Sequence, residues 1–531
     1  MQLVIVLAIL AVITPLVLYS LRLSYRVKSD REFFQGVHTL SARELFDTLA
    51  ASWLMLGNVF LACLIFGKYY GVWNWWLVLT WLLAFLLMMK HVGSVSKALT
   101  SHHTLHTFLF TSFDSRLLRV IAAVITAATG IGIIALEIIV VMALLVPVAG
   151  DAAPWLPFVA GFAILLTLAV YSVLGGFTAV TSTDTYQLYG VVVGLIALVV
   201  VMIRAVAGGV TSVGDVWAAK SPSFASSGTE PFWFFAGLFF LQVPLFLGDF
   251  GTWQRIKACA PNSIPAQKKT FGLLGIANAV AWIVLLIAGI VLATIPAGKL
   301  PGYPNSFLYT TAGPIVDLVS LSSLSGQFGG QPLGVLLVAL LVIGLVCAMM
   351  STADSYLLIA IQAFYDDILP DKCLGQRDAT SGVRFSRIFA IIAVIVSFVI
   401  AIYVVLNKAN FLPIISLFFS LQASLAPLAI LALYHSAPSR FRLTAVLSLI
   451  VTCGACIAYA LWALFIVDGK TPTGAYHQVN VTFVLPVAAF IIPLIALWIH
   501  VVCADGLKSA MKWLWTFAAG SKPDQEIKAV T

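Results

Sequence analysis

Apolar segments long enough to cross a bilayer recur along nearly the whole of this chain. A hydrocarbon core of about 30 Å is spanned by roughly 20 apolar residues in a helix. Such segments cover approximately residues 2–20, 47–67, 72–90, 117–148, 155–174, 182–205, 231–249, 270–296, 332–365, 387–407, 411–434, 441–467 and 480–503. The pattern predicts an all-α, polytopic membrane protein with thirteen transmembrane helices.

The composition supports this class and excludes others. Of the 531 residues, 61% are hydrophobic and 9% are charged, whereas soluble domains carry about 25% charged residues. The sequence has no Walker glycine loop and no glycine-rich turn between a strand and a helix, which disfavours ATP-driven transport. It also has no nucleophile and base pair suited to catalysis, so we do not expect an enzyme.

The distribution of Lys and Arg predicts the orientation. With the N-terminus outside and the C-terminus in the cytoplasm, most of the 29 basic residues fall in the inner loops. The outer loops then keep only Lys68, Arg204, Lys220, Lys299, Lys408 and Lys470. The asymmetry accounts for the net charge of +8, so no nucleic-acid partner is needed. The lack of long glycosylated loops is typical of a bacterial inner membrane, so we expect a plasma-membrane protein.

Segment 2–20 has no basic start and no clear small-residue cleavage site. Its length also suits a full crossing. We therefore expect it to be a retained helix rather than a signal peptide.

A group of polar residues lies within the apolar segment 332–365. Ala348, Ser351, Thr352 and Ser355 follow the spacing i, i+3, i+4, i+7 and share one helix face, with Asp354 beside them. A charged group at the membrane centre costs about 2.5 to 3.5 kcal/mol and usually faces protein or water. Because hard monovalent cations prefer oxygen ligands, this face is suited to sodium. The alternative is that the hydroxyls bond back to carbonyls four residues earlier or hold neighbouring helices together.

Several motifs of this sequence occur together in one known family. They are Ala51-Ser52-Trp53, Gly67-Lys68-Tyr69-Tyr70-Gly71, Gly175-Gly176-Phe177-Thr178-Ala179-Val180 with Thr183-Asp184-Thr185-Tyr186-Gln187, Gln254-Arg255, and the segment from Ser351 to Ser355. The chain resembles the sodium/solute symporters, which include proline, sialic acid and sodium/glucose transporters. The resemblance covers nearly the whole chain.

The resemblance implies a LeuT-type fold in a single transporter domain. Residues 47–205 would form one repeat of five helices and residues 231–434 its inverted copy. Segment 2–20 and the two helices within 441–503 would lie outside the repeats, followed by a cytoplasmic tail at 504–531. The first helix of each repeat would be broken, near residues 52–57 and 242–248, where Gly57 and Pro244 favour unwinding.

The resemblance also implies the ion sites. The main sodium site would use the backbone carbonyls of Ser52, Met55 and Ala348 with the hydroxyls of Ser351 and Thr352. A second site, for sodium or a proton, would use Asp184, Ser351, Asp354 and Ser355.

By the geometry of the family, the substrate residues would be Asn58, Asn74, Glu137, Gln242 and Gln422, with Trp53 and Phe246 as gating aromatics. Leu54 and Val59 are apolar where several relatives carry polar residues, which disfavours a sugar. Glu137 favours a substrate with an amino or other cationic group, unless it pairs with a helix neighbour or water.

These observations predict a symporter, coupled to Na⁺, that imports a small organic solute such as an amino acid, amine or carboxylate by alternating access. The alternatives are a transporter-like nutrient sensor and a proton-coupled symporter. The expected partners are the solute and membrane lipid. The oligomeric state stays open, and a monomer is allowed.

Overall fold

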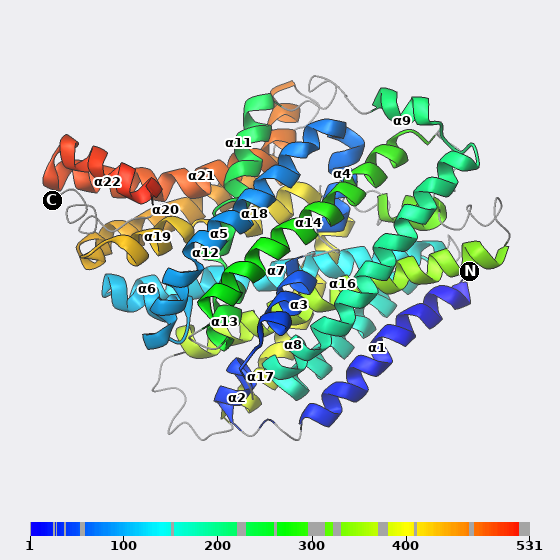
Figure 1. Cartoon of the computed structure of the whole chain (residues 1–531), viewed down its shortest axis with the longest axis horizontal. Helices are drawn as coiled ribbons and strands as arrows, with labels where there is room; N and C mark the ends of the chain where they lie inside the picture. The colour runs from blue at the N-terminus through cyan, green and yellow to red at the C-terminus, as the bar shows by residue number, and fades with distance from the viewer. Residues whose placement is uncertain are drawn as a thin grey trace.

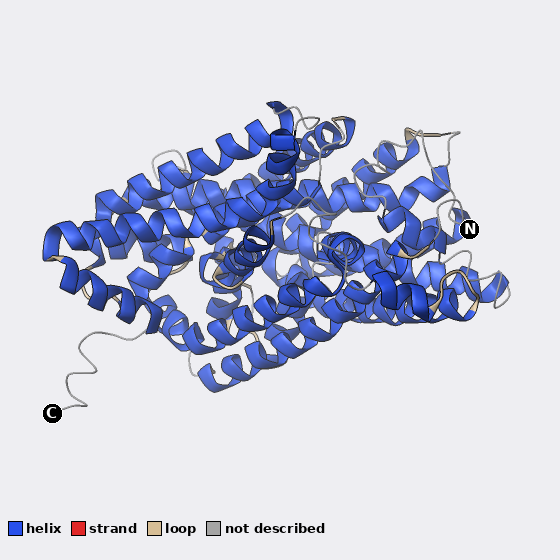
Figure 2. Cartoon of the chain, turned by 90° about the horizontal axis from the view of Figure 1, so that it is seen from above, coloured by secondary structure: helices blue, strands red, loops and turns tan. Residues whose placement is uncertain are grey.

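The computed structural model describes residues 2–24, 27, 29–36, 39–53, 59–149, 153–219, 230–259, 263–295, 314–321, 331–369, 381–407, 411–466 and 472–519. Within these ranges the regular structure is helical, and Leu40 and Cys259 form an isolated parallel bridge. Ten helices of the described chain are long and apolar enough to cross a membrane. Figures 1 and 2 show the resulting assembly of helices from two directions.

The named elements follow the predicted segments and add short helices between them. Their bounds are α1 Gln2–Ser24, α2 Asp30–Gln35, α3 Ala42–Trp53, α4 Leu61–Tyr70, η2 Gly71–Asn74, α5 Trp75–Ser101, α6 Leu105–Phe113, α7 Arg116–Ala149, α8 Leu156–Ala207, α9 Val213–Ala219, α11 Pro231–Gln242, α12 Leu245–Gly248, α13 Phe250–Ala258, α14 Ile264–Ala293, α16 Gln331–Gln362, η3 Ala363–Ile368, α17 Ser381–Leu406, α18 Phe411–Ala423, α19 Ala426–Tyr434, η5 Pro438–Phe441, α20 Arg442–Leu461, η6 Trp462–Ile466, α21 Pro472–Asp505 and α22 Leu507–Ala519.

Helix α8 joins two segments that the sequence predicts as separate spans. It has 52 residues, which as one straight helix would extend about 78 Å, more than twice the hydrocarbon thickness. The helical conformation is interrupted at Gly176, with φ 56° and ψ −150°. Glycine adopts this conformation readily because it has no Cβ. Gly176 therefore divides α8 at the position where the sequence predicts a connection.

Two other predicted spans each contain more than one described helix. The segment 47–67 begins as α3, which ends at Trp53, and α4 begins only at Leu61. The segment 231–249 contains α11 and the single turn α12, and α13 begins directly after it at Phe250. Pro244 precedes α12 and cannot donate a backbone hydrogen bond. The interruption at Pro244 lies where the resemblance implies a broken helix. The other expected break, near residues 52–57, falls largely on residues outside the described ones, among them Met55, Gly57 and Asn58.

The helices pack in two groups. Helix α14 packs against α3, α4 and α5, whereas α16 packs against α7, α8 and α1. Figure 1 shows α1, α8 and α16 running side by side. A Cβ built on Gly344 of α16 would lie 2.5 Å from the Cα of Gly194 in α8. Small residues thus allow the backbones of these helices to approach closely, as is usual in membranes.

Candidate ion and substrate sites

Polar side chains from both helix groups meet at one buried place, which we call the polar cluster. Its members are Thr48 and Ser52 of α3, Tyr171 and Asp184 of α8, Arg255 of α13, and Ser351, Thr352, Asp354 and Ser355 of α16. All of them are buried. The cluster therefore brings together the predicted hydroxyls of α16, the predicted carboxylates and the end of the interrupted helix α3.

Asp184 connects the two groups of helices. Its Oδ1 accepts a hydrogen bond from Ser351 Oγ at 2.5 Å. Its Oδ2 accepts another from Thr48 Oγ1 and lies 3.8 Å from the Nη2 atom of Arg255. Ser351 and Asp184, both predicted for the second ion site, are thus direct partners.

Arg255 is the residue of the cluster that the sequence analysis misplaced. It counts there as a basic residue of an inner loop, but its side chain is only 3% exposed. Nη2 donates to Ser52 Oγ at 2.8 Å and to Ser355 Oγ at 2.7 Å, and Nε donates to Thr48 Oγ1 at 2.9 Å. The guanidinium therefore joins α3 to α16. Its place beside Gln254 in a family motif was the one sequence signal for this role.

Asp354 supplies the second carboxylate. It accepts hydrogen bonds from the Tyr171 hydroxyl and, at 3.3 Å, from Ser355 Oγ. When both aspartates are ionised, the cluster holds two negative charges and one guanidinium. A buried charge without an opposite charge is costly. This arrangement therefore favours the binding of one additional cation.

Thr352 has the hydroxyl best placed to gain a new partner. The side chain is fully buried, and its Oγ1 has no hydrogen-bond partner among the described residues. Leaving a buried polar group unpaired costs about 1 to 3 kcal/mol. A sodium ion would satisfy this oxygen. Ala348 lies one turn earlier on α16 and is fully buried, and Met55 is outside the described residues.

The predicted substrate residues come from several helices. Glu137 is buried on α7, and Asn74 is buried at the end of η2. The amide nitrogen of Gln422 donates to Asp249 Oδ1, beside the interruption between α12 and α13. Asn58 lies outside the described residues.

The two predicted gating aromatics are in contact. The rings of Trp53 and Phe246 have centroids 4.6 Å apart, and both pack against Trp81. These ring contacts join α3, α5 and α12.

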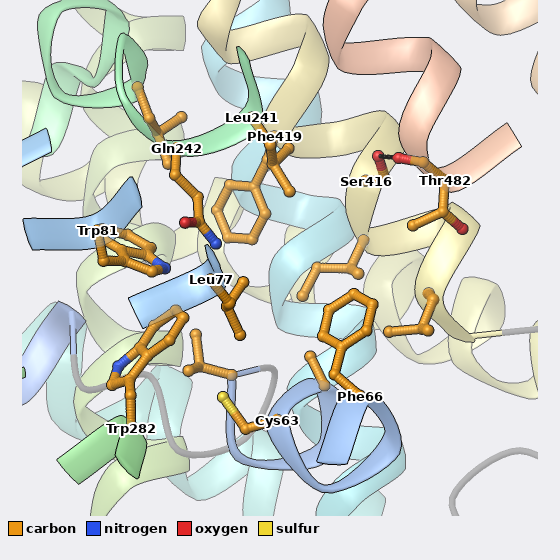
Figure 3. A pocket seen from close by; sticks show the side chains of 15 residues that line it. Cys63, Phe66, Leu77, Trp81, Leu241, Gln242, Trp282, Ser416, Phe419 and Thr482 are labelled. Carbon is orange, nitrogen blue, oxygen red and sulfur yellow. Dashed lines mark hydrogen bonds between the residues drawn. The ribbon is translucent and has the colours of Figure 1, made fainter. Parts of the chain in front are cut away.

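An apolar cavity of about 50 Å³ lies beside the two interrupted helices (Figure 3). Its lining residues are Val59, Ala62, Cys63, Phe66, Leu77, Trp81, Leu241, Gln242, Leu245, Trp282, Leu412, Ile415, Ser416, Phe419 and Thr482. Of the predicted substrate residues, Gln242 is in this lining. The sequence analysis missed the other lining residues because they come from helices far apart in the chain.

A second cavity, of about 430 Å³, has a polar lining. It is formed by Ser29, Glu32, Gln35, Gly36, Thr39, His103, Gln254, Lys257, Ala258 and Gln362. Nε2 of Gln254 donates to Gln362 Oε1 at 2.6 Å and to the carbonyl of Phe34 at 3.0 Å. Gln254 is the direct neighbour of Arg255, and Gln362 lies two helical turns after Ser355. This amide pair therefore connects α13 and α16 in the lining of the second cavity.

Interrupted helices around a buried polar cluster, in a chain with many membrane-spanning helices, define an ion-coupled secondary transporter. A model of the sodium:solute symporter family matches residues 39–441. The chain belongs to this family, and sodium is accordingly its coupling ion. No curated protein matches the chain significantly.

Solved structures similar to this one include two transport proteins. A substrate-bound, outward-open Na⁺-coupled sialic acid symporter has a TM-score of 0.65 and 18% sequence identity, with 92% of this chain and 98% of that chain covered. MhsT in complex with L-phenylalanine has a TM-score of 0.53 and 14% identity, with 87% of this chain and 100% of that chain covered. These likenesses confirm the expected all-helical fold.

Proposed function

We propose that this chain imports a small organic solute, such as an amino acid, amine or carboxylate, together with sodium by alternating access. The observation that carries the proposal is the polar cluster, where α3 and α16 meet around two carboxylates and one guanidinium. A sodium ion held by Ser52, Met55, Ala348, Ser351 and Thr352 would fasten the two groups of helices together. Its release would let them separate.

The membrane potential would drive this cycle. Each sodium ion that moves inward through 100 mV releases about 2.3 kcal/mol, which supports a roughly tens-fold concentration of solute. Binding of sodium would favour the state that is open to the outside and complete the substrate pocket. Loss of sodium to the cytoplasm would then release the solute.

The route of release would pass the amide pair formed by Gln254 and Gln362. This pair belongs to the lining of the second cavity, whose polar character suits a hydrated ion and solute. Breaking a single neutral hydrogen bond costs about 0.5 to 1.5 kcal/mol. Such a contact can therefore open and close within the transport cycle.

The finer topology is part of the same proposal. The proposed count of thirteen helices takes α8 as two spans and each of the segments 47–67 and 231–249 as one. The N-terminus would lie outside and the C-terminus in the cytoplasm of a bacterial plasma membrane. Residues 47–205 and 231–434 would be the inverted repeats. The helix interruption at Pro244 lies in the first span of the second proposed repeat, which supports this division.

At Asp354, a proton is the alternative to a second sodium ion. The carboxylate is fully buried and already accepts a hydrogen bond from Tyr171. Either cation would balance the excess negative charge of the cluster. The second site would consist of Asp184, Ser351, Asp354 and Ser355.

Uptake into proteoliposomes tests the proposal. Purified protein is given a panel of amino acids, amines and carboxylates with an inward sodium gradient, with an equal potassium gradient, or with an inward proton gradient. Saturable uptake that requires sodium is the expected result. Uptake that follows only the proton gradient supports the proton-coupled alternative, and binding without transport supports the sensor.

A further inference from the structure

We propose that the apolar cavity holds the body of the transported solute, by which we mean the part of the molecule other than its amino or carboxylate head group. We further propose that this body is compact and carries no charge and no hydroxyl group. The inference rests on the proposed transport function and specifies its substrate class. It concerns the body of the molecule and is independent of whether the head group is an amine or a carboxylate.

The position of the cavity is appropriate for a substrate. Gln242 and Leu245 flank the interruption at Pro244, and Val59 lies just before α4 in the segment 47–67. Transporters with discontinuous helices bind substrates where the helices are broken, because backbone groups are free there. The segments 47–67 and 231–249 thus both contribute to the same cavity.

The lining carries no charge. Among its described residues there is no Asp, Glu, Lys, Arg or His. The aromatic side chains Phe66, Trp81, Trp282 and Phe419 instead provide broad apolar surfaces. A charged group on the body of the solute would have to lose its hydration without gaining an opposite charge, which is strongly unfavourable.

Gln242 and Ser416, two of the polar residues of the lining, have partners within the protein. In the amide orientation that satisfies both ends of Gln242, its nitrogen donates to Thr80 Oγ1 and, at 3.1 Å, to the Leu77 carbonyl. Its oxygen accepts from Trp81 Nε1 at 3.0 Å. Ser416 donates to the backbone carbonyl of Thr482, which Figure 3 shows as a dashed line. These bonds hold the helices together and leave the wall of the cavity apolar.

One side-chain donor of the lining remains available. Trp282 Nε1 is buried and has no partner among the described residues. It could satisfy a single acceptor of the solute. A body with several hydroxyls would leave most of them unpaired, and each unpaired hydroxyl is expected to weaken binding by roughly 5- to 150-fold.

The size of the cavity limits the body further. A single water molecule needs about 10 to 15 Å³ when volume is measured in this way, and the cavity has about 50 Å³. This space holds a body of only a few carbon atoms. The walls belong to the protein interior, since Leu77, Trp81, Trp282 and Phe419 are buried.

The experiment compares solutes that share a head group and differ in the body. The pairs are L-valine with L-threonine, butyrate with 3-hydroxybutyrate, and isobutylamine with 1-amino-2-propanol. Binding to the purified protein is followed by tryptophan fluorescence in sodium chloride and in potassium chloride, and uptake is measured in proteoliposomes. In the series that binds, we expect the apolar member to bind at least about 5-fold more tightly.

Two variants of α5 test whether the preference for an apolar solute arises in this cavity. Leu77→Ala enlarges the cavity and is expected to shift the preferred body towards one or two more carbon atoms. Leu79→Ala is the matched control, because Leu79 is 44% exposed on the outer side of α5 and is not in the lining. If Leu77→Ala does not fold, Ile415→Val provides the smaller enlargement.

The outcomes separate this inference from the proposed function. Sodium-dependent uptake that favours the hydroxylated members overturns the inference and leaves the proposed function intact. Apolar preference without any sodium dependence supports the inference and refutes sodium-coupled transport. If no member of the three series binds, or if Leu79→Ala changes the preference as Leu77→Ala does, the assigned substrate class is wrong.

Discussion

Replacing Thr352 with valine removes one oxygen from the polar cluster and nearly preserves the volume of the side chain. The hydroxyl is fully buried and has no partner among the described residues, so the substitution breaks no hydrogen bond that the structure describes. If this oxygen ligates sodium, its loss costs about 1.5 to 3 kcal/mol, as for hydrogen bonds to charged groups. At about 1.36 kcal/mol per factor of ten, the sodium concentration for half-maximal uptake should rise roughly 10- to 150-fold.

The stability of the same variant should not fall. Without sodium, the valine replaces a buried, unpaired hydroxyl, so the free energy of unfolding should be unchanged or higher. Sodium titrations of uptake and thermal melts in potassium chloride measure the two effects. Thr452→Val is the control, because its hydroxyl bonds to the Ser448 carbonyl at 2.6 Å in α20. An unchanged sodium requirement in Thr352→Val would refute the reasoning.

Three further predictions concern the cluster and its support. Asp184→Asn or Asp354→Asn should lower the Hill coefficient for sodium in uptake, because each substitution removes one of the two carboxylates that face one guanidinium. A Hill coefficient near one in the parent protein would instead indicate a single sodium ion. Arg255→Met should lower the free energy of unfolding by about 3 to 5 kcal/mol, because it leaves a buried carboxylate without its opposite charge. Adding Asp184→Asn should recover part of that loss. Equal melting temperatures of the parent protein and Arg255→Met would contradict the burial of an ion pair. Gly176→Ala should lower the melting temperature, because its φ is 56° and a Cβ would lie 2.6 Å from a backbone oxygen of α2; Gly454→Ala, which meets nothing within 4 Å, should melt like the parent.

The parts of the fold that depend on local sequence were predictable. Apolar length determines whether a helix can cross a bilayer, and the long helices lie on the predicted segments. Helical spacing likewise placed Ser351 and Ser355 on one face of α16, where both join the polar cluster. Pro244 marked one helix interruption, since proline cannot donate the backbone hydrogen bond.

Contacts between distant segments could not be read from the same patterns. Arg255 follows the predicted span 231–249, as a solvated loop residue would, and its burial depends on the packing of α3, α8 and α16 around it. Tyr171 gave no signal, because a tyrosine in an apolar helix is usually a packing residue. Glu137 was predicted for the substrate site, but it is not in the lining of the apolar cavity, which depends on side-chain directions from several helices.

Equilibrium binding of radioactive sodium to the purified protein tests the central claim most directly, that oxygens of α3 and α16 surround a sodium ion. The account predicts saturable binding by the parent protein and by Thr452→Val. It predicts loss of that binding in the double variant with Ser351→Ala and Thr352→Val. Parent-like sodium affinity in the double variant, or no sodium binding by the parent protein, would contradict the account.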